Sequence, residues 1–252
     1  MYPARTSAVP TPSRPRRAAS VNVDLARRAT AEAVGTGLLV AVVIGSGIFA
    51  QRLTPDDVGL QLLENSVATG AGLVALILAF GSVSGAHFNP VVSLVDRLLG
   101  GLSTKETVVY VSAQVVGGCL GAMVANLMFD LPAVDVSDHV RSGGDLWLGE
   151  IVATFGLLLV ILGVVRSGRA DAAPYAVGGY IAAAYWFTSS TSFANPAVTV
   201  ARSLSDTFAG IAPSSAPMYI VMQLIGAGIA FGLIRLFYPH PHSLLPDQET
   251  PR

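Results

Sequence analysis

The sequence predicts an all-α membrane protein with six transmembrane helices and two half-length helices that enter the bilayer without crossing it. Three observations predict this fold. Of the 252 residues, 52% are hydrophobic and only 12% are charged, about half the charged fraction of a soluble domain. Six apolar runs approach the length of about 20 residues that a helix needs to span the hydrocarbon core. Two shorter apolar segments each begin with Asn-Pro.

The six long apolar runs are the predicted crossings. They occupy residues 30–50, 63–82, 106–128, 147–166, 174–190 and 216–238. Gly and Ala are frequent inside them. Lipid provides no hydrophobic force between helices, so small residues that let backbones approach closely stabilise the packing. We therefore expect a tightly packed six-helix bundle in a lipid bilayer.

The two short segments, 89–98 and 195–205, are predicted re-entrant half-helices. Ten helical residues rise only about 15 Å, which is half the hydrocarbon thickness. Each segment begins with an Asn, a good N-cap, followed by a Pro, which suits the first helical turn. Lipid cannot satisfy the irregular backbone before each one, so this backbone must be buried in protein or line a water-filled cavity.

The chain also repeats itself. Glu32 in the first crossing matches Glu150 in the fourth, and Gln114 in the third matches Gln223 in the sixth. Each half holds three crossings, an odd number, so the halves, about 26–130 and 146–239, must have opposite topology. Paired short segments in inverted repeats indicate a binding region near the membrane midplane.

The basic residues predict the domain limits and the orientation. Residues 1–25 are rich in Pro, Ser, Arg and Ala, and we expect a disordered cytoplasmic tail there, a membrane domain at 26–239 and a C-terminal tail at 240–252. Arg and Lys gather before the first crossing and after the second, fourth and sixth. The positive-inside rule then puts both termini in the cytoplasm, which indicates a multi-pass protein of the plasma (inner) membrane.

Two segments around the Asn-Pro pairs form matching motifs. They are Ser84-Gly85-Ala86-His87-Phe88-Asn89-Pro90-Val91-Val92-Ser93-Leu94 and Ser192-Phe193-Ala194-Asn195-Pro196-Ala197. These motifs resemble the two signatures of the aquaporin and aquaglyceroporin superfamily of major intrinsic proteins. The resemblance covers nearly all of residues 30–238 and implies a homotetramer with one pore per subunit. It implies passive conduction of a small neutral solute, without cofactor or metal. The sequence offers no nucleophile pair, metal cluster or nucleotide loop, so we expect no enzymatic activity, and no basic patch indicates nucleic acid.

The paired motifs have a physical role as the pore midplane. A helix N-terminus carries about half a positive charge and unpaired N–H groups, so two that meet head-on repel cations. Asn89 and Asn195, each followed by Pro90 or Pro196, would donate hydrogen bonds to a passing solute oxygen. The loops before them are the expected ladder of carbonyl acceptors. These loop residues are Gly85, Ala86, His87, Phe88, Ser192, Phe193 and Ala194.

Three ionisable residues in these segments invite other interpretations. His87 could be catalytic or a metal ligand, but it matches an ordinary loop position of the family motif. Intramembrane carboxylates such as Glu32 and Glu150 are often proton relays, which would imply a coupled transporter. In the family, the equivalent Glu residues brace the re-entrant loops by accepting backbone hydrogen bonds. We prefer bracing.

The departure from the family pattern concerns the selectivity filter. Family members usually carry Arg directly after Asn-Pro-Ala, whereas this chain has Val198 there. Family spacing puts the other filter positions at Thr69, Ala183 and Ser192, so we expect a wide, weakly polar constriction without arginine. Arg202 lies one turn beyond Val198 on the same face and could act as a displaced cation. We prefer the alternative, a backbone contact or an ion pair with Asp206 at the rim.

This filter pattern resembles a bacterial aquaporin-like subgroup associated with arsenic-resistance operons. The resemblance suggests glycerol-like or metalloid solutes such as arsenite, beside water. Two other functions stay open. A proton-coupled secondary transporter of a small neutral solute would use Glu32 and Glu150, and a structural membrane protein would have a closed pore.

Overall fold

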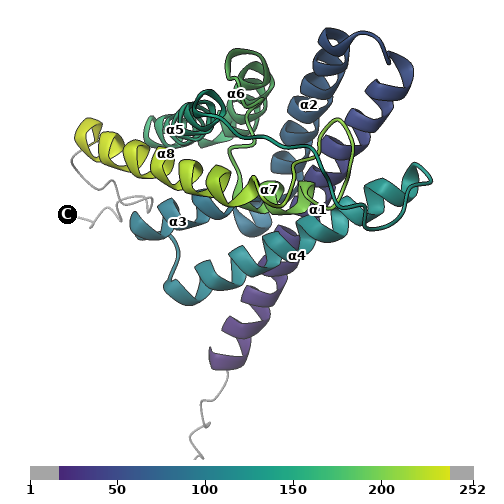
Figure 1. Ribbon diagram of the computed structural model, residues 1–252. Coiled ribbons are helices and arrows are strands. Elements are labelled where there is room, and N and C mark those ends of the chain that lie inside the picture. Colours follow the sequence, from purple (N-terminus) through teal and green to yellow (C-terminus); the bar gives the residue numbers. More distant parts are fainter. Residues whose placement is uncertain (1–16, 239–252) are drawn as a thin grey trace, which may run out of the picture.

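The computed structural model describes residues 17–238, and over this range the chain folds as a helical bundle (Figure 1). Its elements, in order, are α1 (Arg17–Leu53), α2 (Val58–Ser84), α3 (Pro90–Leu98), α4 (Thr104–Met128), α5 (Gly144–Arg166), the 3₁₀ turn η1 (Ala170–Ala172), α6 (Ala173–Phe187), α7 (Pro196–Arg202) and α8 (Ala216–Phe237). The six predicted crossings and the two half-helices all form. Asn89 and Asn195 cap α3 and α7, and a proline occupies the first turn of each.

Five of the six crossing helices, all except α6, are long and apolar enough to span a bilayer. α6 has 15 residues, fewer than the predicted 174–190, because the backbone becomes extended at Thr188. A helix of that length rises only about 22 Å. The crossing is therefore completed by η1 on one side and by the loop that leads into α7 on the other.

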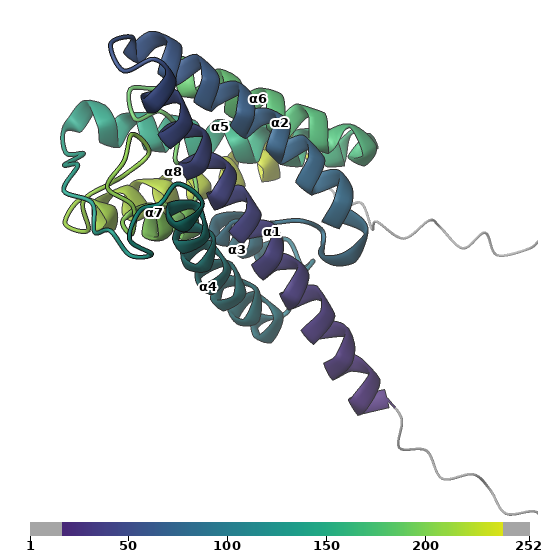
Figure 2. The ribbon, with the colours of Figure 1, turned by 90° about the vertical axis from the view of Figure 1, so that its right-hand side faces the viewer.

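The predicted limit of the N-terminal tail was wrong. α1 already begins at Arg17, so residues 17–25, which we expected in a disordered tail, are helical. Alanines at 18, 19 and 26 favour helix, and Asp24 pairs with Arg27 one turn later, at 2.8 Å. α1 consequently projects beyond the rest of the bundle (Figure 2). Residues 1–16 of the expected N-terminal tail and the expected C-terminal tail at 240–252 lie outside the described residues.

Glycines permit the closest helix contacts, and they occur in matched pairs in the two halves, α1–α4 and α5–α8. A Cβ on Gly117 of α4 would lie 2.0 Å from the carbonyl oxygen of Ala33 in α1, and one on Gly226 of α8 would lie 2.5 Å from that of Ile151 in α5. α2 and α6 meet across the two halves at a further such pair. At that contact Gly70 of α2 faces Gly178 of α6, and the helices approach closely because neither residue carries a side chain.

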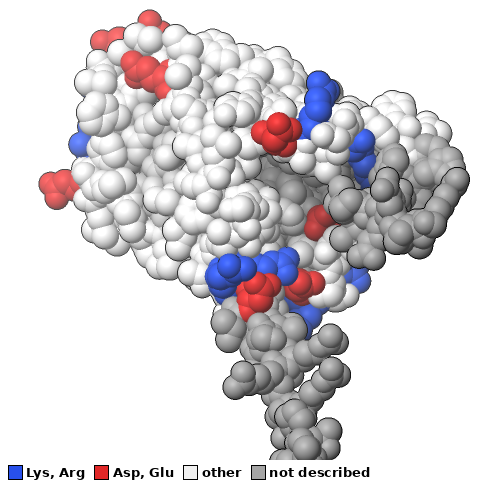
Figure 3. Space-filling model, turned by 180° about the vertical axis from the view of Figure 1, so that it is seen from behind, with Lys and Arg blue, Asp and Glu red and all other residues white. Residues whose placement is uncertain are grey.

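Burial is inverted relative to a soluble protein. The outer surfaces of the helices carry large exposed apolar side chains, whereas Glu32, Glu150, Gln114 and Gln223 are fully buried. On the face shown in Figure 3, charged side chains gather near the margins and most of the area between them carries none. Such a surface suits lipid, because a charged group in hydrocarbon is costly and an apolar one is not.

Candidate functional site

The site is built on the two loops that precede α3 and α7, and these loops have the same unusual backbone. Ala86 and Phe88 have φ of 48° each, and the equivalent Ser192 and Ala194 have φ of 54° and 47°. Side chains disfavour this left-handed region, so the surrounding structure must hold each loop in place.

Glu32 of α1 holds the first loop. Its buried carboxylate accepts hydrogen bonds from the backbone N–H groups of His87 (3.0 Å) and Phe88 (2.7 Å). It also accepts from Ser84 Oγ (2.6 Å) and Gln114 Nε2 (2.8 Å). These four hydrogen bonds satisfy donors of the loop, of the end of α2 and of α4 that would otherwise have no partner inside the membrane.

Glu150 of α5 holds the second loop in the same way. It accepts from the backbone N–H groups of Phe193 and Ala194, both at 2.9 Å, and from Gln223 Nε2 at 2.6 Å. Neither Glu150 nor Glu32 belongs to the wall of the cavity described below. Their contacts are those of a brace.

Asn89 and Asn195 each make two kinds of contact. The Oδ1 atoms cap the half-helices by accepting from Val91 N, at 3.1 Å, and from Ala197 N, at 3.0 Å. Each Nδ2 donates across the midplane to a carbonyl of the opposite loop, Asn89 to Ala194 and Asn195 to Phe88, both at 2.8 Å. An amide NH₂ carries two hydrogens. One donor per Asn therefore remains for a solute in the cavity.

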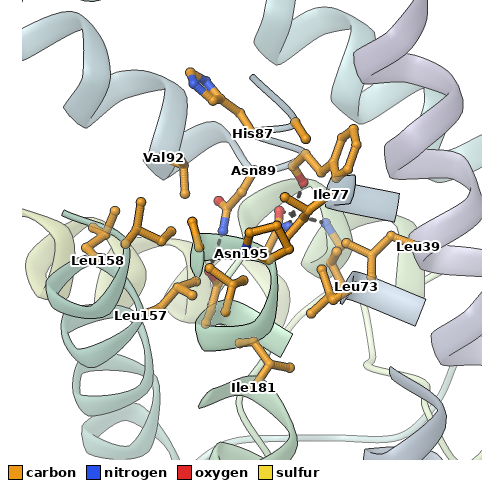
Figure 4. Close-up of a pocket in the computed structure, with 18 of the residues that line it drawn as sticks. Leu39, Leu73, Ile77, His87, Asn89, Val92, Leu157, Leu158, Ile181 and Asn195 are labelled. Carbon is orange, nitrogen blue, oxygen red and sulfur yellow. Dashed lines mark hydrogen bonds between the residues drawn. The ribbon is translucent and has the colours of Figure 1, made fainter. Parts of the chain in front are cut away.

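A cavity of about 400 Å³ runs past this Asn pair. Along α2 it is lined at every fourth residue, by Thr69, Leu73, Ile77, Gly81 and Gly85. Sixteen residues of helix rise about 24 Å, so the cavity extends through most of the bundle. We call its two limits the Arg202 end, where Thr69 lies, and the His87 end, where Gly85 lies. In Figure 4, Asn89 and Asn195 lie between His87 and Ile181.

Most predicted pore residues lie in the cavity wall. These are Thr69, Gly85, Ala86, His87, Phe88, Asn89, Ser192, Phe193, Ala194, Asn195, Val198 and Arg202. Pro90 and Pro196 instead form the buried first turns of the half-helices.

The assignment of Ala183 to the filter was wrong. Ala183 is exposed on the outside of the bundle, and Tyr185 takes its place in the wall. The Tyr185 hydroxyl lies 3.2 Å from Thr69 Oγ1, which fixes it at the Arg202 end. Counting from Asn195 with the family spacing reached Ala183, two residues before Tyr185. The four-residue spacing of Val177, Ile181 and Tyr185 was the signal that could have found it.

Val198 occupies the filter position after Asn-Pro-Ala, and Arg202, one helical turn further on, also reaches the cavity wall. Arg202 is only 2% exposed, lines the cavity, and its guanidinium carbon lies 3.5 Å from the ring centroid of Phe193. Arg202 Nε donates to the carbonyl of Ala209, which is the backbone contact we preferred. The ion pair with Asp206 does not form, because Asp206 accepts instead from Ser137 Oγ and the N–H of Asp138, both at 3.1 Å.

A second guanidinium, which the sequence did not reveal, supports this end of the cavity. Arg141 lies in the loop between α4 and α5 and faces the same Phe193 ring at 5.3 Å. It donates to the carbonyls of Gly210 (2.8 Å) and Phe208 (3.1 Å). Burial lowers the pKa of Arg141 from its ordinary value. This loop thereby fastens the segment that follows α7.

Comparison with known proteins agrees with this architecture. The family described as major intrinsic protein matches residues 19–194 and 170–249. The chain is 55% identical to "Aquaglyceroporin AqpS" of Rhizobium meliloti (strain 1021) over 84% of this chain and 90% of that one. It is 29% identical to "Probable aquaporin AqpM" of Archaeoglobus fulgidus, over 82% and 95%. The X-ray structure of the aquaglyceroporin from Plasmodium falciparum shares the fold, with a TM-score of 0.69 at 21% identity, over 85% of this chain and 98% of that one.

Proposed function

Since this chain belongs to the major intrinsic protein family, whose members are multi-pass membrane channels and not enzymes, we propose that it conducts small uncharged hydroxylated solutes passively, together with water. The observation that carries the proposal is the midplane. Two half-helix N-termini meet there, and each capping Asn keeps one amide hydrogen for the cavity. The positive helix ends repel cations, while the amides bind a neutral oxygen.

The solute class follows from the wall. The cavity is mostly apolar, and its polar side chains are Thr69, Tyr185, Ser192, the Asn pair and the ionisable residues at its two ends. Such a wall suits a solute with carbon or a metalloid on one side and hydroxyl groups on the other. Glycerol and arsenous acid, which is neutral at pH 7, have this form. The relative named as an aquaglyceroporin supports the proposal.

Arg202 supplies the cation of the filter in this proposal. Position 198, where family members usually carry arginine, holds valine here, and the Arg202 guanidinium reaches the cavity from one helical turn further on. Contacts with Phe193 and Ala209 hold the guanidinium against the wall. A held-back guanidinium donates to solute oxygens and leaves more width than an arginine at 198 would. This arrangement suits a filter that admits glycerol-sized solutes and not water alone.

The assembly and orientation are part of the same proposal. The outward apolar side chains, among them Val116, Leu120 and Val124 on α4, suit contact with lipid or with another subunit. The family resemblance supports a homotetramer with one pore per subunit. The basic residues support cytoplasmic termini in the plasma membrane.

Proteoliposomes without any ion gradient test the proposal. Stopped-flow light scattering should show accelerated flux of glycerol and arsenite, and of water, relative to empty vesicles. In a second set of vesicles with an imposed proton gradient, a transporter coupled through Glu32 and Glu150 accumulates solute until a protonophore is added, whereas a channel only equilibrates it. The bracing contacts of both carboxylates favour the channel. The absence of accelerated flux for every small solute would instead support a closed structural protein.

A further inference from the structure

The two half-helices place opposite charges at equivalent positions. Asp96 in α3 and Arg202 in α7 each lie seven residues after the capping Asn, and both line the cavity. His87 and Phe193 are likewise equivalent, two residues before that Asn. As Arg202 packs on Phe193 at one end, Asp96 faces His87 at the other, with Asp96 Oδ2 3.9 Å from His87 Nε2. Neither the family motif nor the proposed function assigns a role to Asp96.

Asp96 is poorly explained by the stability of α3. It lies in the last turn, where the carbonyl ends of the helix disfavour a negative charge. Within the described residues its carboxylate accepts no hydrogen bond at 3.5 Å or less, and its side chain stays 38% exposed in the cavity wall. Gly101 leaves room for it, because a Cβ there would lie 2.2 Å from Asp96 Oδ1. The carboxylate is therefore positioned toward the cavity with free acceptor capacity.

His87 presents the complementary donor. Gln114 Nε2 donates to Ser93 Oγ at 2.9 Å, and the hydroxyl hydrogen of Ser93 can then bond to His87 Nδ1 at 3.0 Å. A neutral His87 that accepts at Nδ1 carries its proton on Nε2. The His87 ring packs edge-to-face against the Tyr110 ring, with the two centroids 5.5 Å apart. Nε2–H thus faces the cavity beside Asp96.

We propose that His87 Nε2 and the Asp96 carboxylate form a second solute-docking site, specific for a hydroxyl group, at the His87 end of the cavity. A gap of 3.9 Å is too long for a direct hydrogen bond. A hydroxyl oxygen about 2.8 Å from each atom fits it, accepting from His87 and donating to Asp96. This inference rests on the proposed function, since it names the chemistry by which the same pore selects its solute.

The pair also explains the exclusion of ions. An anion that reaches the His87 end meets the negative Asp96, and a cation meets the positive midplane and Arg202. A neutral hydroxyl is both donor and acceptor, so it matches both atoms without the cost of a buried charge. The site therefore favours neutral polyols and neutral metalloid hydroxides over salts.

The test is the concentration dependence of glycerol flux through the purified full-length protein in proteoliposomes. Asp96→Ala should raise the half-saturating glycerol concentration about fivefold, equal to about 1 kcal/mol of lost binding. Gly101→Ala should act in the same direction by displacing the carboxylate. Asp171→Asn is the matched charge control, because Asp171 is exposed in η1 and outside the cavity wall. Gly163→Ala is the matched glycine control, with open space around it.

The possible results distinguish failure of the docking site from failure of the proposed function. Failure of the wild-type protein to conduct glycerol or arsenite would reject the proposed function itself. Wild-type conduction with an unchanged half-saturating concentration in Asp96→Ala would reject only the docking site. An equal shift in Asp171→Asn would also reject it, because the effect would then be one of general surface charge.

Discussion

The two re-entrant halves of this protein share a backbone and differ in the side chains that face the solute. Both loops adopt left-handed residues one and three positions before the capping Asn. Both are held by a buried Glu and a Gln, and the Gln also bonds a hydroxyl in the half-helix, Ser93 or Thr199. Groups that hold the backbone are repeated, because each loop must satisfy the same polar atoms away from water.

The groups that face the cavity are free to differ. His87 with Asp96 makes one end of the pore acidic, and Phe193 with Arg202 makes the other basic. Nothing in the bracing network depends on these four side chains apart from the contact between His87 and Ser93. The inverted repeat therefore fixes the path of the cavity, whereas the groups that we propose to select the solute differ between its two ends. The following expectations test that separation.

The largest effect is expected from the braces. Glu32→Leu leaves four donors without an acceptor and Glu150→Leu leaves three, and each orphaned buried donor costs about 1–3 kcal/mol. Both variants should lower the thermal unfolding midpoint in detergent strongly, Glu32→Leu more. Glu64→Leu, at a partly exposed position on α2, is the control. A midpoint unchanged by either brace variant would contradict the bracing role.

The matched glycines should rank next. Gly117→Ala puts a Cβ 2.0 Å from a carbonyl oxygen and Gly226→Ala puts one at 2.5 Å, and overpacking costs about 1–3 kcal/mol. We expect both to lower the unfolding midpoint, with the larger loss for Gly117→Ala. Gly228→Ala, where a Cβ meets open space, should be close to neutral. A larger loss for Gly226→Ala than for Gly117→Ala would contradict the ranking by the distance from the added Cβ to the carbonyl oxygen.

Val198→Arg and Val92→Arg compare the two ends of the pore directly, since both valines line the cavity three residues after the capping Asn. Val198→Arg should lower glycerol flux about tenfold, because a guanidinium narrows the filter beside Arg202. Water flux should fall less. Val92→Arg should lower glycerol flux less, since Asp96 can pair with the new charge. Stopped-flow light scattering in proteoliposomes measures both fluxes. Unchanged glycerol flux in Val198→Arg would contradict the assignment of Val198 to the filter.

The smallest effect is expected from the filter tyrosine. Tyr185→Phe removes the hydrogen bond to Thr69 at 3.2 Å, a loss of about 0.5–1.5 kcal/mol. It should lower the unfolding midpoint slightly and change the ratio of glycerol to water flux by a small factor. Tyr175→Phe, on an exposed side chain, should change neither. Identical flux ratios in both variants would remove Tyr185 from the filter.

Most of the fold was readable from the sequence. Apolar run length predicted the crossings, and Asn-Pro at 89 and 195 predicted where the half-helices begin, because capping and proline chemistry act within a few residues. The match of Glu32 with Glu150 indicated the inverted repeat. The start of α1 was misplaced, since a polar, Ala-containing stretch continues a helix without any apolar signal.

The filter was decided by tertiary structure. Thr69 and Ser192 lie in the cavity wall and Ala183 does not, because the face of α6 that meets the cavity carries Val177, Ile181 and Tyr185. The pairing of Arg202 with Phe193, and of Asp96 with His87, joins side chains whose directions depend on the bent loops before each Asn. The sequence alone therefore determined the helices and the midplane, whose causes are local. Only the tertiary structure determined the charge at each end of the pore, because those contacts depend on how the two halves pack together.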